Sequence, residues 1–121
     1  MAKNQNSKPY DLEERTFLFA RDVRKFVKTL PKTIANIEDI KQVVKASGSV
    51  GANYREANEA ISKKDFVMRM KISRKEAKES AYWLRLIHET NELKNGNEAK
   101  NLLDEANELK KILSSIIEKT K

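Results

Sequence analysis

The sequence contains two pairs of glutamates whose spacing could support catalysis or metal binding. Glu56 lies three residues before Glu59, and Glu76 three residues before Glu79, so each pair would share one face of a helix. Paired carboxylates can bind a metal ion or divide the roles of acid and base. The alternative is a solvated helix face on which the carboxylates pair with nearby lysines and arginines. Mixed-sign charge on helices favours this second interpretation.

Other arrangements of catalytic side chains are missing from the sequence. Helical di-iron proteins use Glu-x-x-His from each of two helices, whereas this chain has no such motif and one histidine, His88. No serine lies in a nucleophile elbow. The segment from Gly48 to Gly51 is too short for a phosphate-binding loop and lacks the lysine that would follow it. With no cysteine either, we expect no enzymatic activity, no bound metal and no cofactor.

The elements that carry these residues are predicted to be long helices. Two prolines and three glycines in 121 residues leave few points at which a helix must stop. Apolar residues recur at helical spacing along most of the chain, and no stretch is typical of a strand. The expected helices run from a cap at Asp11 to Pro31, from Thr33 to about Ala60, from a cap at Ser62 to Asn95-Gly96, and from a cap at Asn97 onward.

Short loops between such helices favour antiparallel neighbours. We therefore predict an all-α, antiparallel up-down-up-down four-helix bundle over residues 11–121, preceded by a flexible N-terminal tail over residues 1–10. The clearest seam is in the third helix, at Phe66, Met70, Ser73, Ala77, Ser80, Leu84 and Ile87. In the second helix the expected apolar face is Ile34, Ile37, Ile40, Val44, Ser47, Tyr54 and Ile61.

Gly48 and Gly51 lie in the middle of the expected second helix. Each glycine inside a helix costs about 1 kcal/mol relative to alanine. The helix either breaks here or is continuous, with the small residues letting a neighbouring backbone come close. We favour the continuous helix, because the apolar periodicity keeps its phase across the segment.

Basic residues are concentrated in the first and third helices of a chain whose net charge is +7. In the third helix, Lys64, Lys71, Lys78 and Arg85 follow one another at seven-residue spacing, with Lys75 beside them. This set, here called the basic stripe or simply the stripe, faces away from the apolar seam of the third helix. It could contact a phosphate backbone, or it could serve solubility alone.

A second basic cluster is expected in the first helix. It consists of Arg21, Arg24, Lys25 and Lys28. In a simple bundle the first and third helices lie on a diagonal, so one monomer would present two separate patches and not one groove. Few aromatic residues are free for stacking on bases, and any contact with nucleic acid would then depend on charge and shape.

The third helix has more apolar surface than one seam requires. Ile72, Leu86 and Leu93 share a second apolar face, and Trp83 lies next to it. A helix that is apolar on two sides must bury both. Part of this face can pack within the bundle, and the rest predicts an interface between subunits, where tryptophan is favoured.

Composition also gives an expectation about location. The chain has no cysteine, its first ten residues are polar, and no apolar run approaches the ~20 residues that a membrane span needs. We expect a cytoplasmic protein without a signal peptide or a membrane partner.

Three segments resemble a known family: KASGSVGANYREA at 45–57, KKDF at 63–66 and RKEAKESAYWL at 74–84. They are similar to the 23S rRNA-intervening sequence proteins, which are four-helix bundles, and the likeness extends over most of the chain. The resemblance implies a homopentameric ring. It also implies kinship with the accessory variability protein of diversity-generating retroelements, which partners a reverse transcriptase and binds nucleic acid. It brings no catalytic residues.

Within the matched segments, four polar residues lie on helix faces near the expected core. They are Asn53, Glu56, Arg74 and Glu79. We hypothesise a buried polar network that fixes the register of the helices. For function, the sequence favours a non-enzymatic, basic, oligomeric protein that binds RNA or DNA or assists a nucleic-acid enzyme. The alternative is a protein-interaction scaffold that binds no nucleic acid.

Overall fold

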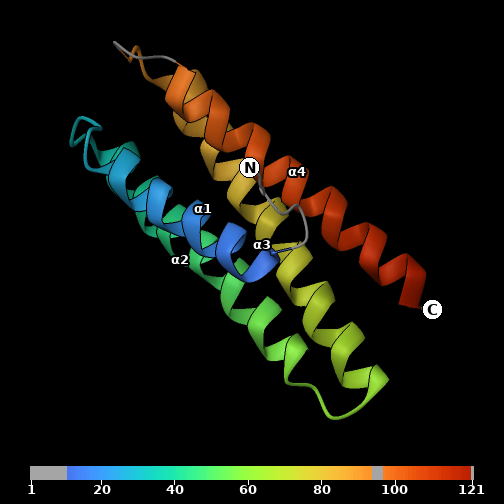
Figure 1. The fold of residues 1–121 in the computed structure, drawn as a ribbon. Helices are drawn as coiled ribbons and strands as arrows, with labels where there is room; N and C mark the ends of the chain where they lie inside the picture. Colours follow the sequence, from blue (N-terminus) through green and yellow to red (C-terminus); the bar gives the residue numbers. More distant parts are fainter. Residues whose placement is uncertain (1–10, 94–96, 121) are drawn as a thin grey trace.

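The computed structural model describes residues 11–93 and 97–120 of the chain and contains four α-helices there. Figure 1 shows them running alternately up and down, which confirms the predicted all-α, four-helix bundle. Their bounds are α1 Leu12–Val27, α2 Ile34–Asn58, α3 Lys63–Thr90 and α4 Asn97–Thr120. The expected flexible tail over 1–10 and the expected stop at Asn95-Gly96 lie outside the described residues.

Local signals set the helix ends. The Asp11 carboxylate accepts a hydrogen bond from the Glu14 backbone N–H at 3.2 Å, and the Ser62 hydroxyl accepts one from the Asp65 N–H at 3.0 Å. Both predicted caps are thus confirmed, and each satisfies a backbone donor that has no partner within its helix. Thr33 caps α2 in the same way. Asn97 is the first residue of α4 and not a cap before it.

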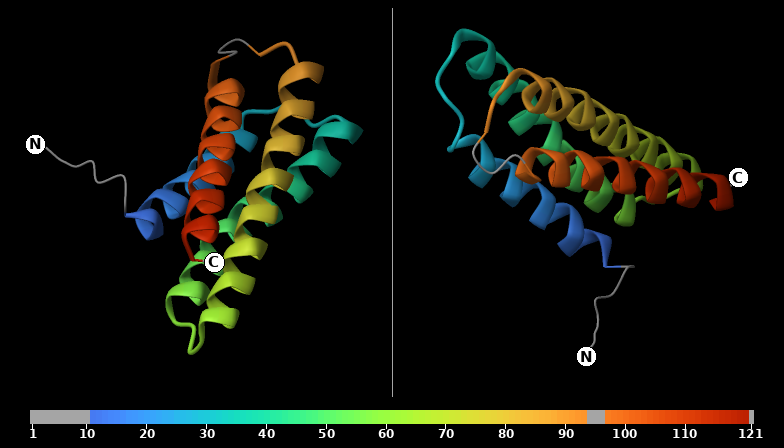
Figure 2. Two further views of the ribbon diagram at one scale, coloured as in Figure 1. Left: turned by 90° about the vertical axis from the view of Figure 1, so that its right-hand side faces the viewer. Right: turned by 90° about the horizontal axis from the view of Figure 1, so that it is seen from above.

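The helices pack as sequential neighbours, with α1 also against α4. Figure 2 shows α1 and α3 on a diagonal, as expected from the sequence. At 16 residues α1 is the shortest helix, while α2 and α3 have 25 and 28. The α2–α3 hairpin therefore continues past the N-terminal end of α1 (Figure 1).

One apolar core joins all four helices. The predicted seam of α3 is confirmed, since all of its members are buried except Phe66, which is half-buried and packs against the core. The largest fully buried side chains are Phe26 and Val23 of α1, Val43 and Val50 of α2, Met70, Leu84 and Ile87 of α3, and Leu109, Leu113 and Ile117 of α4.

The apolar face of α2 agrees only in part with the expectation: Ser47 is buried and Ile40, Val44 and Tyr54 pack against the core, but the isoleucines at the ends do not. Ile34 is 87% exposed, and Ile61, just beyond the helix, is 97% exposed. The residues that α2 buries are Asn36, Val43, Ala46, Ser47, Val50 and Ala57. Because α1 and α3 both pack on α2, the positions that these two helices cover decide its buried face, which includes Val43 and Val50 as well as small residues. The largest apolar residues do not mark that face.

Gly48 and Gly51 lie inside a continuous α2. A Cβ atom added at Gly51 would lie 2.9 Å from the Oγ1 atom of Thr16 in α1 and 3.2 Å from its Cβ. No side chain fits there without movement. The favoured interpretation is confirmed: the glycine lets the two helices pack closely, and that packing offsets its cost within a helix.

Candidate nucleic-acid interface

The outward face of α3 carries the predicted basic stripe. Lys64, Lys71, Lys75, Lys78 and Arg85 are all exposed, while the α3 seam on the opposite side is buried. The seven-residue spacing keeps these cations on one side, because seven residues are nearly two turns of an α-helix. The stripe therefore follows α3 for most of its length.

The members of the stripe differ in how far their charge is already neutralised. Arg85 forms an ion pair with Glu89 at 2.9 Å. The hydrogen bond between these two side chains raises the pKa of Arg85 and lowers the pKa of Glu89. Over the described part of the chain, no ion pair engages Lys64, Lys71, Lys75 or Lys78. Within the stripe, the four lysines are thus the cations most available to a phosphate group.

A shallow cavity of about 240 Å³ lies beside the stripe, between α2 and α3. Its walls are formed by Gln42, Lys45 and Ala46 of α2 and by Lys75, Glu76 and Glu79 of α3. Lys45 is a cation that the sequence analysis did not connect with the stripe. The only signal for it would have been the pairing of α2 with α3 in this register.

An exposed aromatic residue also lies on this face of α3. Tyr82 is 58% exposed and follows Lys78 by one helical turn. Its ring meets Trp83 edge-on, with 5.0 Å between the ring centroids and 82° between the planes. The Trp83 indole N–H donates a hydrogen bond to Oε2 of Glu79 at 3.2 Å. Few aromatics are free, as expected, but one of them, Tyr82, lies on the face of the stripe, between Lys78 and Arg85.

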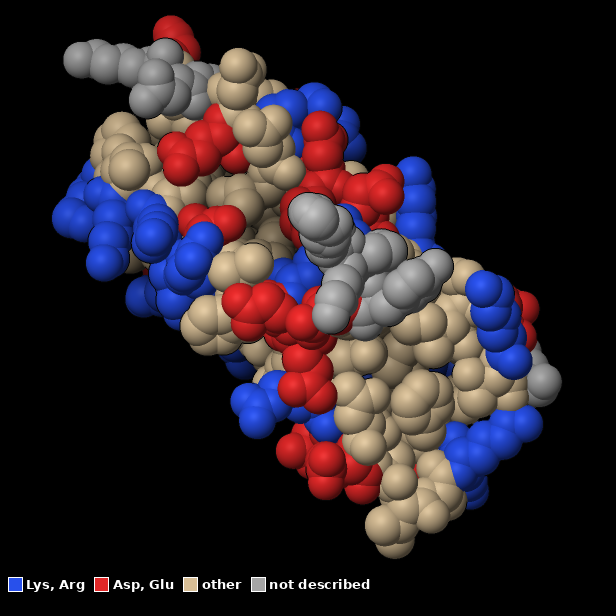
Figure 3. All heavy atoms as spheres, in the orientation of Figure 1, with Lys and Arg blue, Asp and Glu red and all other residues tan. Residues whose placement is uncertain are grey.

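In the predicted cluster of α1, the two arginines already have partners. Arg21, Arg24, Lys25 and Lys28 are exposed, but Arg21 pairs with Asp22 at 2.9 Å. Arg24 donates hydrogen bonds to the carbonyls of Ala20, at 3.1 Å, and of Val44 in α2, at 3.4 Å. Figure 3 shows Lys and Arg side chains gathered over the C-terminal half of α1 and the adjoining part of α2. Since α1 and α3 lie on a diagonal, the two basic regions remain separate.

The residues of the predicted subunit interface are all half-buried in the single chain. Trp83 and Leu93 pack against the core, so part of this second apolar face is covered within the bundle. Ile72 and Leu86 are the other two members. Among nearby apolar side chains, Met68 is 48% exposed.

The four residues of the hypothesised polar network make separate contacts. Asn53 accepts a hydrogen bond from Arg69 at 3.3 Å, and Arg74 donates one to Ser114 at 3.5 Å. Glu79 pairs with Trp83, and both Glu79 and Glu56 are exposed. A single buried network would need both carboxylates inside the bundle. Asn53 instead makes one hydrogen bond to α3, and Arg74 makes one to α4.

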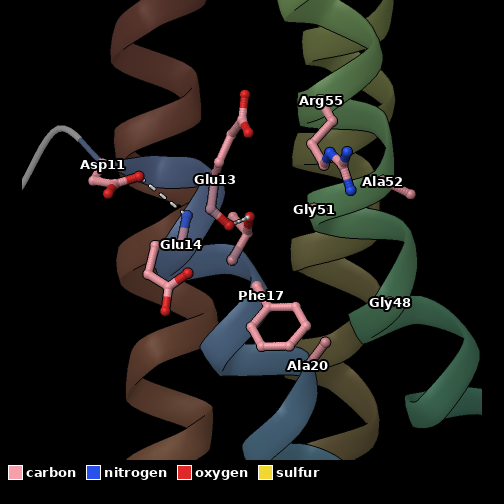
Figure 4. A pocket seen from close by; sticks show the side chains of 10 residues that line it. Asp11, Glu13, Glu14, Phe17, Ala20, Gly48, Gly51, Ala52 and Arg55 are labelled. Carbon is pink, nitrogen blue, oxygen red and sulfur yellow. Dashed lines mark hydrogen bonds between the residues drawn. The ribbon is translucent and has the colours of Figure 1, made fainter.

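A groove of about 490 Å³ lies on the surface between the N-terminal half of α1 and the C-terminal half of α2, beside the close contact of Thr16 with Gly51. Figure 4 shows Phe17 and Ala20 on the α1 side, and Gly48, Gly51 and Arg55 on the α2 side. Phe17 is 60% exposed. Acidic residues at the start of α1 form one end of the groove. No pattern in the sequence predicts this groove.

The glutamate pairs and His88 do not assemble into a metal site. In the described ranges, no three His, Asp or Glu side chains come together in a way that could hold an ion. Glu56 and Glu59 are exposed, while His88 is half-buried near the end of α3. Of the helices described, none has a stretch apolar and long enough to cross a membrane.

Fold and surface together define the class: a four-helix bundle with a basic face. The chain belongs to the 23S rRNA-intervening sequence protein family, whose model matches residues 9–115. A similar solved structure is that of a protein of unknown function from the S23 ribosomal protein family of Bacteroides thetaiotaomicron VPI-5482. The two share 29% identity with a TM-score of 0.75, over 88% of this chain and 97% of the other. Among curated proteins, none matches.

Proposed function

We propose that this protein is a non-enzymatic, oligomeric nucleic-acid-binding protein that contacts the phosphate backbone through the stripe on α3. The observation that carries the proposal is the row formed by Lys64, Lys71, Lys75 and Lys78. All four are exposed, lie on one face and lack an ion pair among the described residues. Lysines placed in this way neutralise phosphates and release bound counterions, which is the main source of affinity that does not depend on sequence.

Assembly would strengthen such contacts. Four lysines on one protomer give modest affinity, whereas several copies in a ring repeat the stripe and turn weak contacts into avidity. The half-buried Ile72 and Leu86 supply apolar surface for self-association. We propose a homopentameric ring. The partners are RNA or DNA, and a reverse transcriptase or another nucleic-acid enzyme that the ring assists in the cytoplasm.

Charge reversal on the stripe tests the proposal. The double variant Lys71→Glu/Lys78→Glu should bind RNA at least tenfold more weakly than the original protein, with an unchanged helical circular dichroism spectrum. The control is Lys32→Glu/Lys119→Glu, which makes the same change in net charge at two exposed lysines outside α3. If both double variants lose the same affinity, net charge and not the stripe governs binding. Unchanged binding by the stripe variant would remove α3 as the contact site.

A protein-interaction scaffold is the second candidate, and the groove between α1 and α2 favours it. An exposed phenylalanine, Phe17, beside a floor of glycine and alanine could receive an apolar side chain of a protein partner. This function predicts that a specific protein copurifies after nuclease treatment and is lost from a Phe17→Ser variant. Retention of that protein by the variant would exclude the groove as its binding site.

A further inference from the structure

Tyr82 lies one helical turn beyond the last lysine of the stripe, Lys78. It follows Lys78 by four residues and Lys75 by seven, so the three side chains share the outward face of α3. With more than half of its surface exposed, the tyrosine presents its ring to the same solvent region as the ammonium groups. A cationic row with an aromatic ring beside it is the arrangement by which proteins hold unpaired nucleotides.

The surroundings of Tyr82 restrict its movement. Trp83 touches the ring edge-on at 5.0 Å between centroids, and Trp83 itself packs against the core. The hydrogen bond from the Trp83 indole to Glu79 fixes the tryptophan further. A ring that is already held loses less conformational entropy when a ligand stacks on it. The Tyr82 ring is therefore held in place before a base stacks on it.

We infer that the α3 face prefers single-stranded nucleic acid, with one base stacked on Tyr82 while its flanking phosphates contact Lys75 and Lys78. This inference rests on the proposed nucleic-acid function and specifies the ligand. In a duplex the bases are stacked on one another, and their faces are closed to a protein side chain. Duplex nucleic acid can therefore use the lysines but not the tyrosine.

The test compares a single-stranded oligouridylate with a duplex RNA of equal length, in the original protein and in Tyr82→Ala. The variant should lose roughly 5- to 150-fold in affinity for the single strand, the range found for removing one stacking ring, and little for the duplex. Tyr82→Phe keeps the ring and should retain single-strand binding. Phe17→Ala removes a similarly exposed ring on α1 and should change neither affinity.

Trp83 provides a second readout, because it is the one tryptophan of the chain. Its fluorescence should change when the single strand binds and should change much less with the duplex. If Tyr82→Ala binds the single strand as tightly as the original protein, or loses both ligands equally, the inference is wrong. In that case a loss in the Lys71→Glu/Lys78→Glu variant would still support the proposed function. If the original protein binds neither the single strand nor the duplex, both this inference and the proposed function are wrong.

Discussion

The side chains of Asn36 and Asn91 exchange two hydrogen bonds across the end of the bundle. Nδ2 of Asn36 lies 2.8 Å from Oδ1 of Asn91, and Nδ2 of Asn91 lies 3.0 Å from Oδ1 of Asn36. Asn36 also donates to the carbonyl of Pro31, and Asn91 to that of Ile87. The pair thus joins the α1–α2 loop, the first turn of α2 and the end of α3. It is the polar cross-link that fixes this end.

The Asn36→Ala variant should lower the free energy of unfolding by about 1–3 kcal/mol, because it leaves the Asn91 amide without its partner next to a buried position. Urea denaturation followed by circular dichroism measures the change. An Asn91→Ala variant should cost a similar amount, and the double variant should cost less than the sum of the two. Additive losses would show that the two amides do not act as a pair.

The close approach of Thr16 and Gly51 predicts opposite effects for two glycine substitutions. Gly51→Ala should destabilise the protein by about 1–3 kcal/mol, because the new methyl group would meet Thr16 at 2.9 Å. At Gly48 the nearest atom is Nη2 of Arg24 at 3.2 Å, the end of a flexible side chain. Gly48→Ala should therefore be neutral or stabilise by up to about 1 kcal/mol, through helix propensity. Equal effects at both positions would contradict this account.

The ion pair between Arg15 and Glu105 joins α1 to α4. Nε and Nη2 of Arg15 bond the two carboxylate oxygens at 2.8 and 2.9 Å, and these hydrogen bonds raise the pKa of Arg15. Both side chains are about 30% exposed. Glu105→Gln should cost about 1 kcal/mol, as expected for a bidentate, partly shielded pair.

The matched control for that pair is Asp104→Asn, which removes the partner of Lys100 at an exposed site on the same helix. It should cost no more than a few tenths of a kcal/mol. Thermal unfolding of the two variants at low and high salt separates them, because salt screens exposed pairs more strongly than shielded ones. A larger loss for Asp104→Asn than for Glu105→Gln would exclude a special contribution from the α1–α4 bridge.

Asp39 gives a prediction for pH. Partial burial and the neighbouring Glu38 raise the pKa of Asp39 above its ordinary value of 3.8. The folded state therefore holds this proton more tightly than the unfolded state, and stability falls as pH rises from that value through the raised pKa. Asp39→Asn should be more stable than the original protein at pH 7. The difference should disappear below pH 3.8, where both states are protonated, and urea midpoints at pH 7 and pH 3 check this.

Several features of the fold were predictable because their causes are local. The caps at Asp11 and Ser62 need one side chain and one turn of backbone, and the α3 seam follows from period alone. The role of Gly51 was inferred correctly, since uninterrupted periodicity across a glycine leaves close packing as its main explanation. The caps and the seam depend on neighbours in the sequence, whereas the contact of Gly51 with Thr16 is tertiary and could be inferred only as close packing against some neighbour.

Other features depend on which helix lies beside which, and at what height. Ile34 matches an apolar pattern but lies on a part of α2 that no neighbour covers, so it is 87% exposed. Lys45 reaches the cavity next to Lys75 only through the register between α2 and α3. Glu79 was assigned to a buried network, yet its partner is the adjacent turn's Trp83. Periodicity predicts which residues share one side of a helix. The packing of the whole bundle decides which neighbours those residues contact.

The most direct test of the central claim is the affinity of the purified protein for a structured RNA and a matched duplex DNA, measured between 50 and 200 mM salt. If the four lysines of α3 neutralise phosphates, the logarithm of the association constant should fall with the logarithm of salt concentration at a slope of roughly −3 to −4 per engaged protomer. No binding at 50 mM, or a slope near zero, would contradict the claim. The basic face would then be a surface for solubility, and the groove beside Phe17 would become the first site to study.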